Sequence, residues 1–588
     1  MTARLAEEQS FATHDGQQLF YRYWPAAADV PRRGAVILFH RGHEHSARMA
    51  HLVDELDLPG HAFFAWDARG HGRSPGERGY SPSAGTSVRD IQTFVDHIRD
   101  FYGIAPEDIA VIGQSVGAVL AAAWVHDYAP PIRALVLASP AFRIKLYVPL
   151  ALPGLRLMFK LRGRFFVNSY VKPKLLTHDP ARIASYQSDP LIARAIAVNM
   201  LLDLHDMAKR VVADAAAITV PTQVLISGAD WVVHRKPQDQ FFERLSATRK
   251  ERIVLDGFHH DTLGELERER ATGPIRSFVL REFDTPQAPV SLLDAHRHGP
   301  FADEYTALKQ SPSVAMAAYW ASLRGGLRVS SLVSSGIALG FQRGFDSGSS
   351  LDYVYRNRAE GHSPLGKLID RNYLDSIGWR GIRQRKLNIE ELIADAIARL
   401  QRAGEPARIV DIAAGHGRYV LDAIAGATRG RANIERILLR DYSPPNVEAG
   451  RALIVEKGFG GQASFELGDA FDAESLAALE PRPTLAIVSG LYELFSDNAP
   501  IRASLGGLAR AVAPGGYLVY TGQPWHPQLE FIARTLKNHR GEPAWVMRRR
   551  SQTELDELVA SAGFRKVAQR IDEWGIFTVS LAQRVTDA

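Results

Sequence analysis

Apolar residues fall into two series of short runs, and each series alternates with helical patterns. The first series lies within residues 11–140, and its runs are continuous, which is typical of parallel strands covered on both faces. A helical pattern over 88–97 separates two of them. The predicted strands are 35–39, 62–66, 109–112 and 134–138. This order of strand and helix predicts βαβ units.

The first series is interrupted at residues 141–215, where lysine and arginine alternate with apolar residues. Beyond that stretch a helix is predicted over 271–283. We therefore predict a first domain over 1–285, with 141–215 inserted as a lid above its sheet, and a linker over 286–300. Strand-like runs resume after the lid, at 222–226 and 252–255.

The second series follows a region with helical patterns throughout, residues 301–400. Further apolar runs then alternate with helical segments, so 401–588 is predicted to form a second core. Its predicted strands are 408–411, 436–440, 463–466, 485–488 and 517–520. The expected fold class is therefore α/β in both domains.

The composition is ordinary for a globular protein, and it removes several kinds of chemistry. The chain has 588 residues, which is too long for a single core. It contains no cysteine, which excludes disulfides, thiolate metal sites and cysteine nucleophiles. The net charge of +5 comes without a nucleic-acid-binding motif, so we expect no nucleic-acid partner. With no signal sequence and no long apolar run, we expect a cytoplasmic protein.

A serine nucleophile is predicted at the end of the strand 109–112. There Gly113-Gln-Ser115-Val-Gly117 has the glycine spacing of a sharp strand-to-helix turn that exposes the serine hydroxyl and aims the Val116 N–H at a developing oxyanion. A serine hydroxyl needs an imidazole to take its proton. Asp230 and the pair His259-His260 follow later strands, in the order serine, acid, histidine.

These motifs resemble the monoacylglycerol lipase and lysophospholipase group of α/β-hydrolases, of the serine aminopeptidase S33 type. The matching segments are 39–46, 67–74, 113–117 and 257–261. The resemblance implies an α/β-hydrolase fold with a helical lid, a lipid-like ester substrate and the triad Ser115, Asp230 and His260, with His259 as the alternative histidine. It implies oxyanion donors at Gly42 and Val116. Arg41 and His43 depart from the family's His-Gly-x-Gly pattern.

The basic lid at 141–215 has two interpretations, and the sequence does not separate them. It is either a solvated helical cap, whose long basic side chains cover apolar surface, or a surface that docks on anionic membrane to collect lipid. The second interpretation would place the protein peripherally at the inner membrane face.

A nucleotide-type cofactor site is predicted in the second core. Asp411 ends a strand and is followed by the turn Gly415-His-Gly417, which lets the backbone approach a ligand closely. Asp441 ends the next strand, where an acid binds ribose hydroxyls. A dinucleotide fingerprint would need glycine at 420, where valine stands. After the third strand come Asp469 and Ala470, where an acid can meet an adenine amino group.

The ordered set resembles class I S-adenosylmethionine-dependent methyltransferases, which implies a Rossmann-like fold and S-adenosylmethionine as cofactor. Candidate acceptor-site residues are Tyr492, Glu493 and His526, and the 301–400 region is expected to cap the cofactor or line the acceptor pocket. No metal site is predicted.

The whole chain resembles bacterial fusions of a lysophospholipase-like hydrolase with a methyltransferase domain. The favoured hypothesis is a bifunctional enzyme. One alternative keeps only the hydrolase active, with the second half as an S-adenosylmethionine-binding regulatory domain. Another makes both halves a binding scaffold, which would not need serine, acid and histidine in order.

Overall fold

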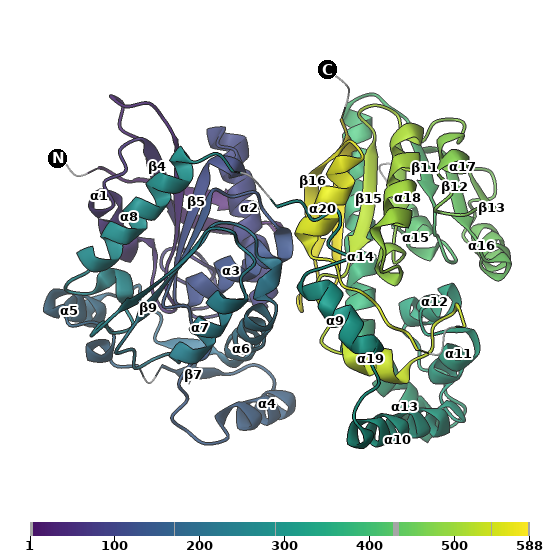
Figure 1. The fold of residues 1–588 in the computed structure, drawn as a ribbon, viewed down its shortest axis with the longest axis horizontal. Coiled ribbons are helices and arrows are strands. Elements are labelled where there is room, and N and C mark those ends of the chain that lie inside the picture. The colour runs from purple at the N-terminus through teal and green to yellow at the C-terminus, as the bar shows by residue number, and fades with distance from the viewer. Residues whose placement is uncertain (1–3, 170, 288–289, 427–433, 542–543, 586–588) are drawn as a thin grey trace. The chain divides into compact units, whose positions relative to one another are not determined.

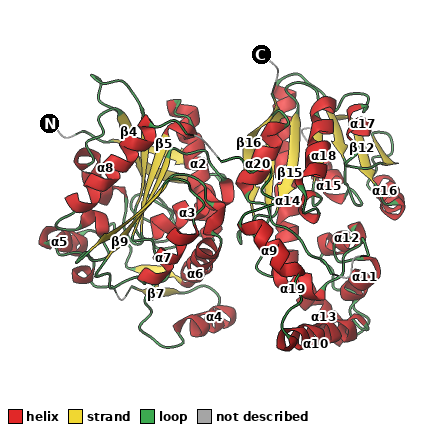
Figure 2. Cartoon of the chain, in the orientation of Figure 1, coloured by secondary structure: helices red, strands yellow, loops and turns green. Residues whose placement is uncertain are grey.

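The computed structural model describes residues 4–169, 171–287, 290–426, 434–541 and 544–585. The chain forms two compact units, Met1–Val290 and Ser291–Ala588. Each has its own central sheet flanked by helices (Figures 1 and 2). The second unit begins inside the stretch predicted as a linker, where the Leu292 N–H donates to the Glu557 carboxylate at 2.7 Å.

The described part of the first unit contains an eight-stranded sheet in the order β1-β2-β4-β3-β5-β6-β9-β10. In this order, the six strands from β4 to β10 are parallel and include every strand predicted from a continuous apolar run. An antiparallel pair that we did not predict, β1 and β2, extends one edge. The strands are β1 (Glu7–Ala12), β2 (Gln18–Trp24), β3 (Gly34–Phe39), β4 (His61–Trp66), β5 (Ile109–Gln114), β6 (Ala134–Ala138), β9 (Thr222–Ser227) and β10 (Lys250–Leu255).

Helices cover both faces of this sheet (Figure 1). α1 (His51–Glu55) and α8 (Glu269–Asp284) lie on one face and share a buried apolar cluster with the strands. α2 (Ala84–Tyr102) and α3 (Val116–Tyr128) lie on the other. This burial explains the continuous apolar runs, because every residue of the central strands is covered on both sides.

The predicted lid lies in the connection between β6 and β9, two strands that pair directly in the sheet. It is therefore an insertion that leaves the order of the strands intact. Its main elements are α4 (Ala151–Arg162), β7 (Phe166–Asn168), α5 (Pro180–Ser188), β8 (Ala195–Ala197) and α6 (Val198–Ala213).

The described part of the second unit contains a seven-stranded sheet in the order β13-β12-β11-β14-β15-β17-β16. The five strands from β13 to β15 are parallel and match the five predicted ones, whereas β16 and β17 were not predicted and run antiparallel. The strand order reverses between β11 and β14, and open α/β sheets bind ligands at such a switch point. The strands are β11 (Ala407–Asp411), β12 (Ile434–Asp441), β13 (Ala463–Leu467), β14 (Leu485–Val488), β15 (Tyr517–Gly522), β16 (Phe564–Ile571) and β17 (Thr578–Arg584).

Three groups of helices surround this second sheet. One face carries α14 (Ile377–Arg402), α15 (Arg418–Gly426) and α16 (Pro444–Glu456). The other carries α17 (Ala473–Ala477), α18 (Asn498–Ala511) and α20 (Gln552–Ser561). A third group has a separate apolar cluster and consists of α9 (Pro300–Lys309), α10 (Val314–Ser331), α11 (Ser335–Arg343), α12 (Gly348–Arg356), α13 (Pro364–Leu374) and α19 (Leu529–Thr535). Among the described residues, no helix combines the length and apolarity needed to cross a membrane.

Candidate active sites

Ser115 lies on the sharp turn between β5 and α3. Its backbone has φ 55° and ψ −112°, a conformation that L-residues rarely adopt. A Cβ at Gly113 would lie 2.8 Å from the Ala118 Cα, and one at Gly117 would lie 2.5 Å from the Phe39 carbonyl oxygen. Only glycine therefore fits on either side of Ser115, and the close packing of α3 on the sheet fixes the position of the hydroxyl.

The three predicted hydrolase residues meet in one hydrogen-bonded chain. The Ser115 hydroxyl lies 2.7 Å from Nε2 of His260, and His260 Nδ1 lies 2.8 Å from an Asp230 carboxylate oxygen. The second Asp230 oxygen accepts the backbone N–H groups of Val232 and Val233. Burial alone would raise the pKa of Asp230, but His260 and the backbone donors outweigh burial and lower it. An ionised Asp230 keeps the proton of neutral His260 on Nδ1, which leaves Nε2 free to accept the serine proton.

The alternative histidine, His259, does not contact Ser115. Its ring lies against that of the lid residue His178, with centroids 3.9 Å apart. Three possible metal-ligand atoms of His178, His259 and Glu265 lie within 4.8 Å of one another. Glu265, however, already accepts the backbone N–H groups of both histidines and the Thr177 hydroxyl. We interpret this cluster as a network that ties the lid to the histidine loop.

The two predicted oxyanion donors lie side by side. Val116 is the first residue of α3, so its N–H has no acceptor within the helix. A Cβ on Gly42 would lie 3.1 Å from a methyl carbon of Val116, which places the Gly42 backbone directly against this helix end. This proximity fits the prediction that the backbone N–H groups of Gly42 and Val116 donate to an oxyanion near Ser115.

Arg41 and His43, which depart from the family pattern, are accommodated by burial and backbone strain. The Arg41 guanidinium bonds Glu44 at 2.8 Å and lies 3.7 Å from Asp261. His43 has φ 70°, the left-handed conformation that glycine adopts without strain.

Asp261 anchors the lid next to the catalytic histidine. It is fully buried and accepts a 2.7 Å bond from Nε of Arg182, on lid helix α5. Burial by itself would raise the pKa of Asp261, but Arg182 and Arg41 outweigh burial and hold it far below its ordinary value. Removing one partner of such a pair leaves an uncompensated buried charge.

In the second unit, the predicted glycine turn follows β11. Gly415 and Gly417 have φ of 58° and 75°, and a Cβ on Gly417 would clash with Leu439 at 2.4 Å. Asp411 supports this turn from beneath, because its carboxylate accepts the Ala413 N–H and, at 2.6 Å, the Tyr419 hydroxyl. Burial raises the pKa of Asp411 to about 7, with Tyr419 opposing the shift. Asp411 is therefore a positioning residue for the turn.

Asp441 has the geometry of a ligand-binding acid at the end of β12. One of its oxygens accepts the Gly415 N–H and the other accepts the Ser443 N–H, each at 2.9 Å. Each carboxylate oxygen can accept more than one hydrogen bond. At the end of β14, the buried Ser489 hydroxyl has no partner among the described residues. Asp441 can therefore accept further hydrogen bonds beside the glycine turn, and the Ser489 hydroxyl lies across the switch point without a partner among the described residues. These groups fit the ribose and amino-acid parts of S-adenosylmethionine.

The two residues predicted after β13 differ in their surroundings. Asp469 is exposed and its carboxylate accepts the Phe471 N–H at 2.8 Å, whereas Ala470 is buried with the residues of α17 and α18. Asp469 thus remains accessible to a ligand, and Ala470 forms part of the buried apolar cluster.

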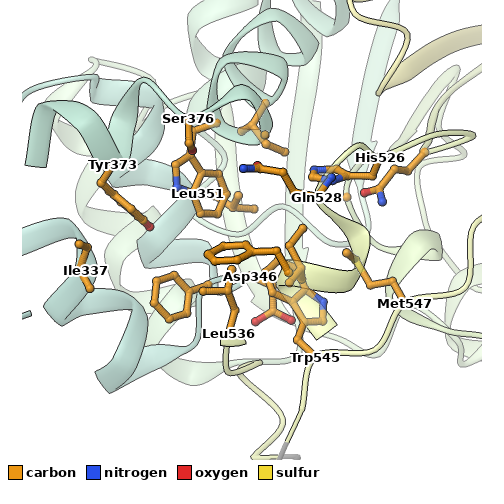
Figure 3. A pocket seen from close by; sticks show the side chains of 18 of the residues that line it. Ile337, Asp346, Leu351, Tyr373, Ser376, His526, Gln528, Leu536, Trp545 and Met547 are labelled. Atoms are coloured by element: carbon orange, nitrogen blue, oxygen red, sulfur yellow. The ribbon is translucent and has the colours of Figure 1, made fainter. Parts of the chain in front are cut away.

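A cavity of about 370 Å³ lies within the second unit, lined largely by the helices of the 301–400 region (Figure 3). Glu493 and His526 line it, as predicted for an acceptor site. Tyr492 does not: its ring is buried under α18, and its hydroxyl lies 2.9 Å from that of Ser504. In the turn after β14, Glu493 points into the cavity and Tyr492 points into the core. The prediction of Tyr492 as an acceptor-site residue is therefore wrong.

Arg385 is a cavity residue that our sequence reasoning missed. It lies on α14, and its guanidinium donates to Glu493 at 3.0 Å and lies over the Phe577 ring. A signal for it exists in the sequence, because Arg385 occupies a core-facing position between Ile382 and Ile389 at helical spacing. A charged residue on an apolar helix face is expected to have a buried partner.

Comparison with known proteins matches two families to the chain. Residues 275–584 match a family described as "Putative methyltransferase", and residues 30–267 match the family "Serine aminopeptidase, S33". The chain is 55% identical over 585 residues to the Escherichia coli (strain K12) protein "Uncharacterized protein YnbC", covering 99% of both chains.

The first unit alone also has named relatives. It is 26% identical over 287 residues to a monoacylglycerol lipase of Mycolicibacterium smegmatis, covering 48% of this chain and 99% of that protein. Among solved structures, a Paleococcus ferrophilus monoacylglycerol lipase is 24% identical and covers 47% of this chain and 99% of its own, with a TM-score of 0.40.

Proposed function

Because the chain belongs to the family described as "Putative methyltransferase" and carries a serine aminopeptidase S33-type hydrolase domain, we propose that it is a bifunctional enzyme. The first unit hydrolyses lipid-like esters of the monoacylglycerol or lysophospholipid class. The second unit transfers a methyl group from S-adenosylmethionine to a small or lipid acceptor. The observation that carries the first activity is the hydrogen-bonded chain from Ser115 through His260 to Asp230.

The hydrolytic mechanism follows from that chain. His260 Nε2 takes the proton of Ser115 as the oxygen attacks the ester carbonyl, and Asp230 stabilises the imidazolium. The backbone N–H groups of Gly42 and Val116 stabilise the oxyanion, and His260 then protonates the leaving alcohol. A water molecule, activated by His260, releases the acid from the acyl-enzyme.

The ester class rests on two supports. Several relatives of the first unit are named monoacylglycerol or monoglyceride lipases. The lid presents exposed apolar side chains beside basic ones. On α4, Leu161 is 78% exposed and lies between Lys160 and Arg162, and Leu150, which precedes the helix, is 80% exposed. Of the two interpretations of the lid we therefore favour contact with an anionic lipid surface.

For methyl transfer, Asp441, the Gly415 turn and the loop containing Asp469 and Ala470 would hold the cofactor. Bound there, S-adenosylmethionine supplies an activated methyl group. Asp441 binds the ribose hydroxyls, and the glycine turn lets the backbone approach the cofactor. Asp411 keeps the turn in place through its bonds to Ala413 and Tyr419.

Two binding and activity measurements test this proposal. The full chain should hydrolyse monoacylglycerols and short acyl esters, and it should bind S-adenosylhomocysteine in calorimetry with a one-to-one stoichiometry. Asp441→Ala should weaken that binding by at least about tenfold, because a lost charge-assisted hydrogen bond costs roughly 1.5–3 kcal/mol. Absence of ester hydrolysis would refute the first activity, and absence of S-adenosylhomocysteine binding the second.

A further inference from the structure

We propose that the cavity of the second unit binds an uncharged amphiphile carrying a hydroxyl group, and that Glu493 takes the proton of this hydroxyl during methyl transfer. This inference deepens the proposed methyltransferase function and rests on it. It names the class of acceptor as an alcohol or phenol on an apolar body, and the ligand series below separates this class from acids and amines.

The walls of the cavity select for an apolar body. Figure 3 shows aliphatic and aromatic side chains from separate elements around the same space, among them Ile337, Leu351, Leu536, Trp545 and Met547. A volume of about 370 Å³ lies within the range of small-molecule sites. A ligand with ten or so aliphatic carbons would be covered by these residues, whereas a polar ligand of that size would leave its groups unpaired.

The charges around the cavity argue against an acidic acceptor. Arg385 is the one arginine or lysine among the described residues that line it, and its guanidinium is bonded to Glu493 at 3.0 Å. The other lining carboxylate, Asp346, lies 2.9 Å from His539. A carboxylate or phosphate would therefore enter a buried space without a cation left to balance it, which is costly.

Two polar groups of the wall, Glu493 and His526, offer an acceptor and a donor to a ligand. Nε of Arg385 and Nε1 of Trp545 are further buried donors without a partner among the described residues. Glu493 Oε2 is buried and has no partner among the described residues, while Oε1 is bonded to Arg385. Burial lowers the pKa of His526 to about 3, so the ring is neutral. Its Nδ1 accepts the Gln528 N–H at 3.1 Å, which assigns the ring proton to Nε2. A hydroxyl group, which both donates and accepts, matches this pair better than a carboxylate does.

Glycines leave space beside His526 and beside Arg385, the partner of Glu493. A Cβ on Gly378 would lie 3.1 Å from His526 Nε2, and one on Gly490 would lie 3.0 Å from the Arg385 guanidinium. Gly490 and Glu493 follow β14, at the switch point of the sheet. The carboxylate is therefore positioned at the edge of the sheet where the cofactor is proposed to bind.

The transfer step balances with the groups named. The acceptor O–H proton passes to Glu493 Oε2, the oxygen forms a bond to the methyl carbon, and the bond between that carbon and the sulfonium sulfur breaks. The products are a methyl ether, S-adenosylhomocysteine and a protonated Glu493, which then loses its proton to solvent. Burial raises the pKa of Glu493, with Arg385 opposing the shift, which brings the carboxylate closer to a useful proton acceptor.

A matched ligand series tests the acceptor class by binding alone. 1-Decanol, decanoate and decylammonium have the same chain and differ in the head group. Calorimetry on the full chain, with S-adenosylhomocysteine present, should show decanol binding at least about tenfold tighter than either ion. Ser376→Phe places a larger side chain in the cavity, at a position labelled in Figure 3, and should abolish decanol binding to it. Any decanol binding that remains in this variant would come from the first unit. Equal or tighter binding of decanoate or decylammonium would overturn the inference.

Variants of Glu493 test the proton transfer. Glu493→Gln should reduce methyl transfer to decanol by at least about 100-fold while changing decanol binding by less than about tenfold. In the wild type, transfer should fall as the pH decreases through the pKa of Glu493, and the remaining activity of the glutamine variant should lose this dependence. The exposed Glu474→Gln is the matched control and should leave transfer unchanged.

The outcomes separate the two levels of the proposal. A Glu493→Gln variant that retains full methyl transfer would overturn the role of Glu493. Failure of the wild type to bind S-adenosylhomocysteine would refute the proposed methyltransferase function, and preference for decanol in that case would still support the ligand class of the cavity.

Discussion

At the scale of single residues, the proposed hydrolase activity depends most on Ser115. Its hydroxyl, held by a strained turn between two obligatory glycines, is the nucleophile that we propose. Ser115→Ala should lower kcat for hydrolysis of p-nitrophenyl butyrate by about 10⁴-fold or more, because the remaining groups cannot form an acyl-enzyme. The change should leave S-adenosylhomocysteine binding as it is.

His259 supplies the matched control for that experiment. His259→Gln should retain most of the hydrolysis, since its ring contacts His178 and not Ser115, whereas His260→Gln should lose it. Loss of activity in His259→Gln together with retention in His260→Gln would reverse our assignment of the catalytic histidine.

Asp411 predicts a pH dependence of stability in the second unit. Burial raises its pKa to about 7 in the folded state, against 3.8 for an ordinary aspartate. The folded state therefore binds more protons than the unfolded state between these values, and the free energy of unfolding contributed by Asp411 falls as the pH rises through this window. Asp411→Asn stays neutral, so its stability relative to the wild type should increase from pH 5 to pH 8, by about 2.5 kcal/mol.

Denaturant unfolding of both proteins, followed by the fluorescence of the second unit, measures this difference. A gap between variant and wild type that is the same at pH 5 and pH 8 would show that the Asp411 carboxyl is ionised at both, contrary to the account.

At the scale of elements, helix α4 of the lid gives the clearest prediction. None of its residues is buried, and it combines exposed leucines with Lys160 and Arg162. The protein should co-sediment with vesicles containing anionic lipid, and high salt should weaken the association. Lys160→Glu/Arg162→Glu should reduce binding by at least about tenfold while preserving hydrolysis of a short, water-soluble ester.

Arg235→Glu/Lys236→Glu on α7 (Arg235–Arg244) makes the same change in charge at another exposed site and is the control. Equal vesicle binding by the wild type and the α4 variant, or no binding at low salt, would contradict membrane contact by the lid and support the interpretation as a solvated cap.

Which elements could be predicted depended on their burial. Central parallel strands such as β3 and β5 are covered on both faces, so their continuous apolar runs stand out in the sequence. Strand β17 is also largely buried, but Thr578 and Ser580 interrupt its apolar run, so the strand was not predicted. The edge strand β1 is almost wholly exposed, and so it lacks an apolar run.

The candidate sites show the same limit. The three triad residues belong to motifs at strand ends. Their order along the chain and the local turns were enough to predict that they come together. Arg385 and Glu493 are 108 residues apart in sequence and meet only because α14 packs beside the turn after β14. Tyr492, one residue from Glu493, points into the core instead, and no local pattern distinguishes the two.

At the scale of the whole molecule, the two units have separate cores. One buried cluster of the first unit draws on α1, α8 and its sheet, and three clusters of the second draw on residues beyond 290. We therefore expect residues 1–290 and 291–588, produced separately, each to fold cooperatively. The first fragment should hydrolyse esters and the second should bind S-adenosylhomocysteine. Circular dichroism and the two assays would check this, and a fragment that stays unfolded would show that the units stabilise each other.

We propose that the whole chain carries two chemistries, and a single labelling experiment can measure both of them. A lipid extract is incubated with S-adenosylmethionine labelled in its methyl group and with the wild type, Ser115→Ala or Asp441→Ala, and both released fatty acid and labelled lipid are measured. We predict that Ser115→Ala loses acid release and retains labelling, and that Asp441→Ala does the opposite. Labelling by the wild type no greater than that by Asp441→Ala would contradict the claim and favour a hydrolase with a regulatory second half.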